Sequence, residues 1–297
     1  MSVYSIKDLE HLSGIKAHTI RIWEQRYDLF SPQRTETNIR FYNDVDLKLI
    51  LNIAMLKDHG MKISKIVAMP MDLLEEGVRK ISIENRSHQD QISALTLAMI
   101  DLDEEEFSSL LEESINMLGF EKTMMEIIYP FMHKIGILWM TNSINPAQEH
   151  FITHLVRQKL IVATDQAESS NSGPLFLLFL PEGELHELGL LFANFLLRSK
   201  GVRTIFFGQT VPIDAIEEVY LKLNPQFIIT AMTTAPESKE VPKFVKRLGS
   251  KFQNCQVYVT GSRVIGQDLE FPSNVSILNQ FDDLIELTQT LTIKQLN

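Results

Sequence analysis

A glutamate and a histidine stand two residues apart in the loop Glu184-Leu-His186-Glu-Leu-Gly189, shortly after an apolar run. A neutral imidazole is a good metal ligand, and a carboxylate hydrogen-bonded to its other ring nitrogen fixes the tautomer and raises the basicity. Gly189 leaves room for a bulky group near the start of the next helix. On spacing alone, a helix-capping loop with a solvent-exposed histidine is the simpler interpretation.

The segments around this loop alternate between short apolar runs and helical patterns. Such strands, alternating with helices, predict a doubly wound, Rossmann-like parallel sheet over residues 173–297, which binds ligands at the carboxyl ends of its strands. The predicted strands are 175–180, 204–207, 226–230, 256–260 and, more weakly, 275–278, and the predicted helices are 187–200, 212–222 and 238–249.

Residues 90–167 are rich in Leu, Met and Glu, and their apolar residues recur at helical spacing, which predicts a small helical bundle. The polar run from Gln166 to Gly173 is a predicted linker, and residues 71–90 are predicted to be a linker or a poorly packed helix. His150 and His154 stand four residues apart on one helix and could bind a metal, although no third ligand is evident.

Residues 1–72 predict a winged helix-turn-helix. Ser5 and Asp8 form an acidic variant of the capping box, Gly14 suits a tight turn, and a second helix is predicted over residues 17–27. The polar stretch from 30 to 42 resembles a hairpin and is interpreted as a wing. Residues 1–70 carry ten Lys and Arg against eight Asp and Glu, whereas the remainder carries eighteen against thirty. Contact with DNA phosphates is therefore expected only in the first segment.

The composition of the whole chain limits the remaining classes. With 297 residues, 44% hydrophobic and 22% charged, the chain is an ordinary multidomain globular protein. No apolar run approaches the ~18–20 residues of a membrane helix. The single Cys255 excludes an intrachain disulfide, which together with the lack of a secretory pattern predicts a cytoplasmic protein. No nucleophile–base pair indicates catalysis, so no enzymatic activity is predicted.

The N-terminal pattern Thr19-Ile-Arg21-Ile-Trp23-Glu24, followed by Pro32-x-Arg34 and Arg40-Phe41-Tyr42, resembles the DNA-binding domain of the MerR family of transcriptional regulators. The resemblance implies a dimer on a palindromic promoter element, with RNA polymerase as a further partner. A solvated helix face is the alternative for Arg21 and Arg26, and Trp23, Tyr27 and Phe41 are expected in the core. The residues implied near double-stranded DNA are Thr19, Arg21, Arg26, Arg34, Arg40 and Tyr42.

The C-terminal pattern resembles a cobalamin-binding domain whose Asp/Glu-x-His-x-x-Gly loop supplies the lower ligand of cobalt. Its marks are Glu184-x-His186-x-x-Gly189, Gly208-Gln-Thr-Val-Pro212, Thr230-Ala-Met232 and Thr260-Gly261. The resemblance implies that His186 binds cobalt, and that the dimethylbenzimidazole tail leaves cobalt and lies in a channel beside the sheet. Thr260 stands where the family has a first glycine, which adds bulk along that channel.

In the bundle, Trp139 and, after nine residues, Glu149-His150 resemble the cap of the CarH/LitR-type light-dependent regulators, which join a MerR-like head to a bundle and a cobalamin domain. The resemblance implies that Trp139 and Glu149 enclose the upper adenosyl group of adenosylcobalamin. In that class a histidine directly after the tryptophan captures cobalt once light has expelled this group. Here that residue is Met140.

These patterns predict a DNA-binding regulator, a repressor rather than an activator, that cobalamin controls from between the bundle and the C-terminal domain. A response to light and assembly into dimers or tetramers are part of the same interpretation. One alternative keeps the regulator but gives it a degenerate sensor for another ligand or a protein, as Met140 and Thr260 favour. A second alternative is a corrinoid carrier subunit of a methyltransferase, which would not need residues 1–70.

Overall fold

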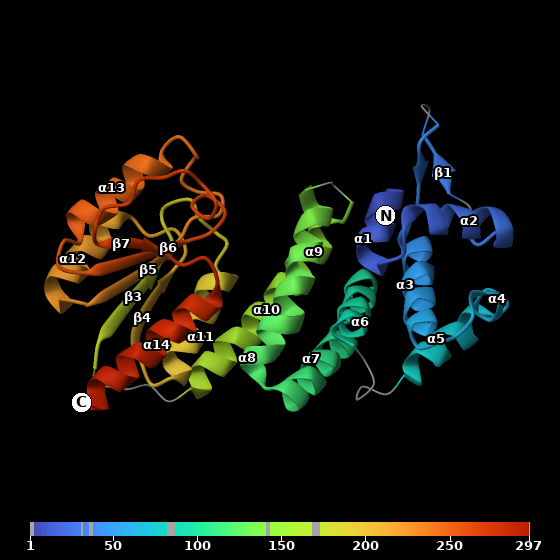
Figure 1. The fold of residues 1–297 in the computed structure, drawn as a ribbon, viewed down its shortest axis with the longest axis horizontal. Helices are drawn as coiled ribbons and strands as arrows, with labels where there is room; N and C mark the ends of the chain where they lie inside the picture. The colour runs from blue at the N-terminus through green and yellow to red at the C-terminus, as the bar shows by residue number, and fades with distance from the viewer. Residues whose placement is uncertain are drawn as a thin grey trace. The chain divides into compact units, whose positions relative to one another are not determined.

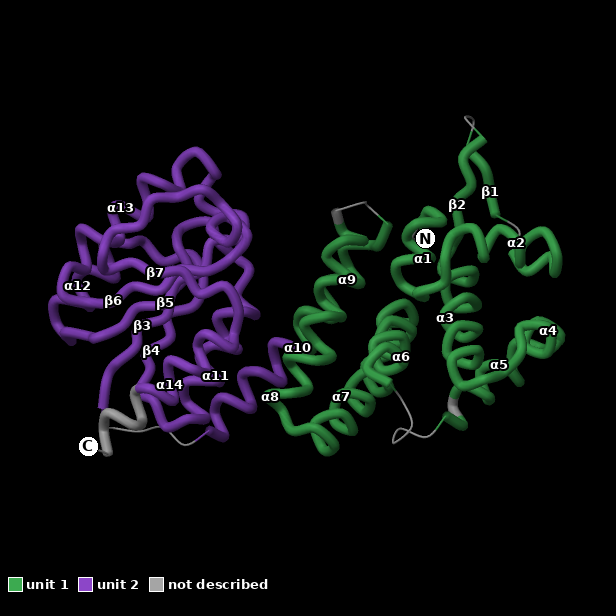
Figure 2. Tube along the Cα trace, in the orientation of Figure 1, with its two compact units in different colours: residues 1–155 green, residues 156–297 purple. Residues whose placement is uncertain are grey.

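The computed structural model describes residues 3–30, 32–35, 38–81, 87–140, 143–167 and 173–296. The chain divides into two compact units, residues 1–155 and 156–297, which Figure 2 colours separately. The division falls inside the helix α10 (Pro146–Gln166), so the first unit contains both the predicted head and most of the predicted bundle. The predicted linker at 168–172 lies outside the described residues, and the predicted boundaries at 72, 90, 167 and 173 stay predictions.

The head is a winged helix-turn-helix, as predicted (Figure 1). A capping box opens its first helix: Ser5 Oγ accepts from the Asp8 amide at 3.3 Å, and Asp8 Oδ2 accepts from the Ser5 amide at 2.7 Å. Gly14 ends that helix with φ 73°, a conformation that favours glycine. The elements of the head are α1 (Ile6–Ser13), α2 (Ala17–Tyr27), β1 (Gln33–Arg34), β2 (Arg40–Phe41) and α3 (Asp44–Asp58).

The helix predicted as one option for residues 71–90 is confirmed over part of that range as α5 (Met71–Arg79), which follows the short α4 (Ile63–Ile66). The expectation of poor packing is wrong, because Leu74 and Val78 are only 1% and 8% exposed. These two residues are four apart and therefore share one helix face, which α5 turns toward α3. Residues 82–86 lie outside the described part.

The predicted helical bundle is confirmed, and a π-helical turn interrupts it. The segments α8, η2 and α9 follow one another directly, so they form one continuous helix with a wider turn in its middle. In the core of the bundle, Phe107 and Phe131 pack with their ring centroids 6.0 Å apart. The elements are α6 (His88–Asp101), α7 (Glu104–Leu118), α8 (Phe120–Thr123), η2 (Met124–Ile128), α9 (Tyr129–Met140) and α10 (Pro146–Gln166). In the part of the chain that the structure describes, no helix is long and apolar enough to cross a membrane.

Polar contacts tie the head to the bundle within the first unit. Ser143 Oγ, in the loop between α9 and α10, donates to Asp8 Oδ2 at 3.0 Å, and both residues are buried. At the other end of α1, Gln89 Nε2 lies 3.4 Å from the Leu12 carbonyl, and Lys134 Nζ of α9 donates to Gln89 Oε1 at 2.9 Å. The helix α1 is therefore held by the bundle at both of its ends.

The second unit contains the predicted doubly wound sheet. Its five parallel strands run in the order β4-β3-β5-β6-β7, so the order reverses between β3 and β5. All predicted strands and helices of this unit are present. They are β3 (Leu175–Phe179), α11 (Leu188–Ser199), β4 (Arg203–Gly208), α12 (Ile213–Leu223), β5 (Phe227–Ala231), α13 (Val241–Lys251), β6 (Gln256–Thr260) and β7 (Val275–Ile277).

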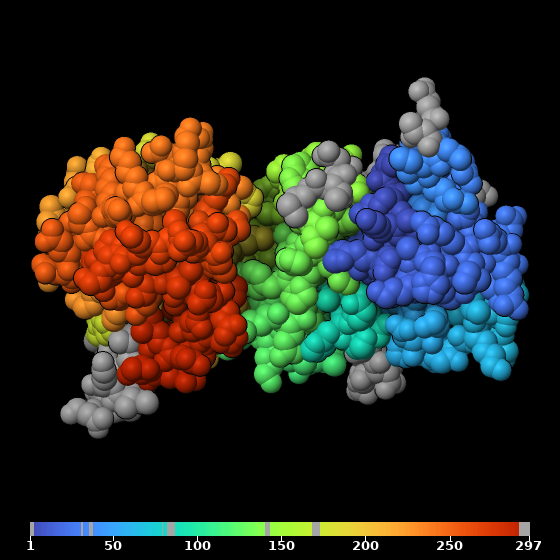
Figure 3. Space-filling model, turned by 45° about the horizontal axis from the view of Figure 1, so that its top comes forward, coloured from blue at the N-terminus to red at the C-terminus, as the bar shows by residue number. Residues whose placement is uncertain are grey.

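The two faces of the sheet are covered by different helices (Figure 1). Leu177, Ile228 and Val257 pack with α12 and α13 on one face, and α11 covers the other. A helix that the sequence did not predict, α14 (Phe281–Leu296), lies against α11, where Phe281 meets Phe192 edge to face at 4.8 Å. Its outward side forms part of the surface of this unit, red in Figure 3.

Candidate functional site

The predicted DNA-facing arginines lie on the surface of the head. Arg21 and Arg26 are exposed on α2, and Thr19 is half-buried on the same helix. Arg34 is exposed on β1 of the wing, where its guanidinium donates to Asn38 Oδ1 at 2.7 Å. A second helix and a wing that both carry exposed cations form a surface suited to DNA phosphates.

Arg40 and Tyr42 meet at one carboxylate of α2. Arg40 Nε lies 3.0 Å from Glu24 Oε1, and the Tyr42 hydroxyl donates to Glu24 Oε2 at 3.2 Å. Tyr42, which the resemblance places near DNA, is only 1% exposed, and its backbone pairs with that of Tyr4. Burial first, and then the charge of Glu24, raise the pKa of Tyr42 to about 12. Tyr42 therefore holds the wing to α2 from inside the head.

The predicted core residues of the head differ in how deeply they are buried. Trp23 is buried, as expected, whereas Tyr27 and Phe41 are half-buried. The Arg26 guanidinium lies over the Tyr27 ring, 5.4 Å from its centroid. Tyr27 thus supports the exposed end of α2.

In the bundle, Trp139 is not a core residue, because it is 45% exposed near the end of α9. Glu149, in the first turn of α10, accepts from the Thr153 hydroxyl at 2.9 Å, and its other oxygen lies 3.4 Å from His150 Nδ1. The side chain of Met140 lies outside the described residues. His154 is exposed, and within the described ranges no group of three His, Cys, Asp or Glu is arranged to hold a metal.

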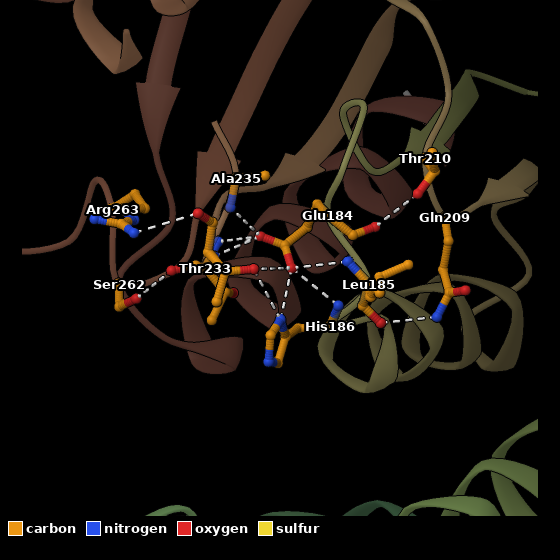
Figure 4. A network of polar contacts seen from close by, with 10 residues as sticks. Glu184, Leu185, His186, Gln209, Thr210, Thr233, Ala235, Ser262 and Arg263 are labelled. Atoms are coloured by element: carbon orange, nitrogen blue, oxygen red, sulfur yellow. Dashed lines mark hydrogen bonds and ion pairs between the residues drawn. The ribbon is translucent and has the colours of Figure 1, made fainter. Parts of the chain in front are cut away.

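The predicted pairing of Glu184 with His186 is present in the second unit. His186 Nδ1 lies 2.7 Å from Glu184 Oε1 and donates to it, because an ionised carboxylate can only accept. The imidazole then carries its lone pair on Nε2, which points away from this network (Figure 4). The His186 side chain is 57% exposed and that of Glu184 is fully buried. The pair is arranged as a metal-ligating histidine with its supporting carboxylate.

The loop that carries this pair lies at the carboxyl end of β3, beside the reversal of strand order, where doubly wound sheets bind ligands. The loop after β4 braces it: Gln209 Nε2 donates to the Leu185 carbonyl at 2.7 Å, and Thr210 Oγ1 lies 3.4 Å from the Glu184 carbonyl. Through these contacts the segment from Gly208 to Pro212 supports the histidine loop.

Glu184 has a further set of partners, which the sequence did not indicate, in the loop after β5. The backbone N–H groups of Thr233, Thr234 and Ala235 donate to Glu184 Oε2 at 2.7, 2.6 and 3.0 Å. The Thr234 hydroxyl donates to Oε1 at 3.1 Å. Backbone donors carry no sequence signature, so only the threonines after a strand end could have indicated this site.

These donors decide the charge of Glu184. Burial alone would raise its pKa, but hydrogen bonds from the His186 ring and from the N–H groups of Ala235, His186 and Thr234 outweigh burial. They hold the pKa of Glu184 well below its ordinary value. The carboxylate therefore stays ionised at neutral pH and keeps the proton of His186 on Nδ1.

Three further predicted cofactor residues, Thr230, Gly189 and Gly261, lie in the second unit. Thr230 is fully buried on β5 between Phe179 and Val259, and within the described residues its hydroxyl has no hydrogen-bond partner. At Gly189 an added Cβ would meet only Phe281, at 4.0 Å, so this helix start is open. Gly261 has φ 101°, and a Cβ there would lie 2.4 Å from the Met232 carbonyl oxygen.

Comparison with known proteins agrees with this arrangement. Residues 4–69 match the MerR HTH family regulatory protein family, and residues 91–163 match the B12 binding domain family. The HTH-type transcriptional repressor CarH of Myxococcus xanthus is 30% identical over 251 residues, which cover 82% of this chain and 84% of that protein. The chain belongs to the CarH family. The repressor CarA of the same organism is 24% identical over 237 residues, 79% of this chain and 78% of that protein.

A solved structure supports the fold of this CarH-family chain. The monomethylamine corrinoid protein of Methanosarcina barkeri superposes on this chain with a TM-score of 0.57 at 13% identity. The superposition covers 70% of this chain and 100% of that protein. At this identity the likeness shows the fold alone.

The residues of the second unit fit a corrinoid. Cobalt takes an imidazole ligand readily, and Nε2 of His186 bears its lone pair on the exposed side of the Glu184 pair. Among the described residues the fully buried hydroxyl of Thr230 has no hydrogen-bond partner, and a ligand would supply one. Gly189 and Gly208 carry no Cβ, so no side chain at these two positions would obstruct a ligand at the loops.

Proposed function

We propose that this chain is a DNA-binding transcriptional repressor controlled by cobalamin, with adenosylcobalamin as the bound form. One observation carries the proposal. A histidine whose tautomer is fixed by a buried carboxylate lies at the ligand-binding edge of a doubly wound sheet, in a chain that begins with a winged helix-turn-helix. A corrinoid carrier has no use for residues 4–69, and we therefore assign the chain no catalytic role.

On the DNA side, Arg21 and Arg26 of α2 are the proposed major-groove and phosphate contacts, with Thr19 beside them. Arg34 and Arg40 of the wing would hold the backbone on either side. One head reads one half-site, so the proposed target is palindromic double-stranded DNA bound by two chains. The acidic remainder of the chain stays off the phosphates, because like charges repel. RNA polymerase is a proposed further partner at the promoter.

On the sensor side, His186 would hold cobalt through Nε2, while Glu184 keeps the proton on Nδ1. Thr230 would donate to the nucleotide tail, and Gly189 would leave room for it, while Gly261 lets the loop after β6 pack against the Met232 backbone. Trp139, Glu149 and His150 are the proposed contacts of the upper, adenosyl side. When bound, adenosylcobalamin supplies a cobalt–carbon bond that light can break.

Control of DNA binding requires that the cofactor prefer one assembly state over another, since a ligand with equal affinity for both states shifts neither. We propose that the loaded chain associates into dimers or tetramers with higher DNA affinity, and that light reverses this by removing the adenosyl group.

The first experiment is a visible absorbance spectrum of the purified protein after incubation with adenosylcobalamin in the dark and desalting. The wild type should retain a spectrum in which histidine replaces the dimethylbenzimidazole base on cobalt. His186→Ala should lose the colour or shift the spectrum, whereas His11→Ala, at an exposed histidine of α1, should match the wild type. A wild type that retains no colour would refute control by cobalamin and favour a sensor for another ligand.

The second experiment selects bound duplexes from a random-sequence library and measures their affinity in the dark and after illumination. The double variant Arg21→Ala, Arg26→Ala should weaken binding and lower the dependence of binding on salt, since each lost phosphate contact lowers the slope by about one. Equal affinity of loaded chain before and after illumination would refute the response to light.

A further inference from the structure

The loop after β5 faces two ways. The N–H groups of its residues Thr233, Thr234 and Ala235 converge on one oxygen of Glu184, and their direction sets where that carboxylate lies. Successive N–H groups that point to one anion form a nest, whose shape depends on the orientation of each peptide plane. What holds those planes is therefore part of the histidine site, although it touches neither Glu184 nor His186.

The carbonyl side of the same three peptides contacts Ser262 and Arg263, after β6, and Figure 4 shows the two contacts that their side chains make. The Met232 carbonyl accepts from the Arg263 amide at 3.0 Å. The Thr233 carbonyl accepts from the Ser262 hydroxyl at 3.0 Å, and the Thr234 carbonyl accepts from the Arg263 guanidinium at 3.3 Å.

Each of these contacts continues through one peptide group. The Met232 carbonyl and the Thr233 N–H belong to one peptide plane, as do the next two pairs along the chain. Because a peptide is planar, a donor that fixes its carbonyl also fixes the direction of its N–H. All three planes thus bridge Glu184 on one side and Ser262 or Arg263 on the other. Polarisation of each peptide by both partners strengthens the chain of bonds.

Contacts with their neighbours hold Ser262 and Arg263 in place. Gly261 approaches the Met232 backbone so closely that an added Cβ would lie 2.4 Å from its carbonyl oxygen. The amides of Val264 and Ile265 both donate to the Gly261 carbonyl at 3.0 Å, and Val264 is fully buried. The Arg263 guanidinium also donates to the Ser238 hydroxyl, so its two terminal nitrogens reach acceptors on two residues. The planar fork of arginine suits this double contact, whereas a lysine amine would favour one.

We propose that Ser262 and Arg263 form an outer clamp that positions the cobalt ligand, with Arg263 as its main positioning residue. The clamp orients the peptides of residues 233–235, these orient the Glu184 carboxylate, and Glu184 keeps the His186 proton on Nδ1. Its role for cobalt rests on the proposed function, whereas its role for the imidazole is a property of the chain alone.

The test uses the full-length chain and three variants. Arg263→Met removes the guanidinium and keeps much of the bulk, and Arg263→Lys keeps the charge. Arg247→Met is the matched control, since Arg247 lies in the same unit and pairs with Asp214 of α12 at 2.6 Å. Circular dichroism establishes that each variant folds.

Two readouts apply to each variant. Without cobalamin, nitrogen-15 resonances of the His186 ring report the tautomer, and hydrogen exchange reports the amides of residues 233–235. With hydroxocobalamin, titration gives the affinity, and the visible spectrum at saturation gives the fraction of histidine-ligated cobalt. A merely structural role would change neither the tautomer nor the ligated fraction.

In Arg263→Met we expect amide exchange at least about 10-fold faster, a mixture of tautomers, and cobalamin affinity about 10–100-fold weaker, as is usual when a supporting partner of a metal ligand is removed. Arg263→Lys should lie between this variant and the wild type, and Arg247→Met should match the wild type. Wild-type exchange and tautomer in Arg263→Met would overturn the clamp.

The two proposals fail separately. A wild type that binds neither adenosylcobalamin nor hydroxocobalamin refutes the proposed function, and the nitrogen-15 and exchange measurements still decide the clamp. If Arg263→Met does not fold, Ser262→Ala replaces it, because it removes only the bond to the Thr233 carbonyl. Faster exchange of the Thr234 amide in that variant supports the clamp, and unchanged exchange overturns it.

Discussion

Replacing Glu184 with glutamine should destabilise the second unit by about 3 kcal/mol at neutral pH. The carboxylate accepts from seven donors, four at Oε1 and three at Oε2. A glutamine places an NH2 group where one oxygen was, so either three or four donors face another donor. Each buried donor left unsatisfied costs about 1–3 kcal/mol, so three of them cost about 3 kcal/mol at the lower value.

Hydrogen exchange of the β5 segment is the appropriate assay, since both tryptophans, Trp23 and Trp139, lie in the first unit and their fluorescence does not report on the second. The matched control is Glu182→Gln, an exposed glutamate in the same loop. If Glu184→Gln lowers the opening free energy by no more than this control does, the assignment of the N–H nest to Glu184 is refuted.

Four further predictions follow from the geometry. Because the pKa of Glu184 is lowered on folding, its stabilisation is present above the unfolded pKa of about 4.3 and is lost as pH falls below it. The difference in opening free energy between wild type and Glu184→Gln should therefore shrink by about 1 kcal/mol between pH 6 and pH 3.5, and a constant difference would contradict this. Gly261→Ala should cost about 3 kcal/mol or more through the Met232 backbone, whereas Gly266→Ala, with φ 71° and nothing within 4 Å, should cost only its backbone strain of about 1–2 kcal/mol. Equal losses for the two glycine variants in thermal unfolding would contradict the close approach. Ser143→Ala should lower the stability of the first unit by about 1 kcal/mol in urea unfolding followed by tryptophan fluorescence, because it removes the donor to the buried Asp8 carboxylate. Ser64→Ala, at an exposed serine, should have no effect, and an equal loss in both would refute the contact. Arg34→Ala should weaken DNA binding to all sequences alike, and a change confined to one base position would refute a phosphate contact.

The strands β3 and β5 were predictable from sequence because each is a nearly continuous apolar run, which is typical of a sheet covered on both faces. All five residues of β3 are buried. The helix α14 was missed because few of its residues form an apolar, buried face. In its first half the residues that are only 1% exposed are Leu284 and the polar Thr288. Its place depends on Phe281 packing against α11, a tertiary contact that periodicity does not indicate.

The candidate site was predictable where side chains carry the chemistry and not where the backbone does. Glu184 and His186 are two residues apart, and their contact follows from local spacing. The peptides of residues 233–235 are about 50 residues further along, and any sequence supplies N–H groups. Tyr42 illustrates the opposite case, since a phenol suits both a phosphate and a core, and only its pairing with Tyr4 places it inside.

The contact between Asp8 and Ser143 bears on how this protein can be cut and recombined. One carboxylate both caps α1 and accepts from the loop before α10, so the first helix of the DNA-binding head is completed by a residue 135 positions away. A chimera that joins the head of one relative to the bundle of another near residue 80 would take these two partners from different proteins. The buried Asp8 carboxylate would then lose its donor wherever the second protein lacks Ser143. To exchange target specificity between relatives, α2 and the wing should therefore be transplanted into an intact first unit. The helix α1 should stay with the bundle of its own chain, which it contacts.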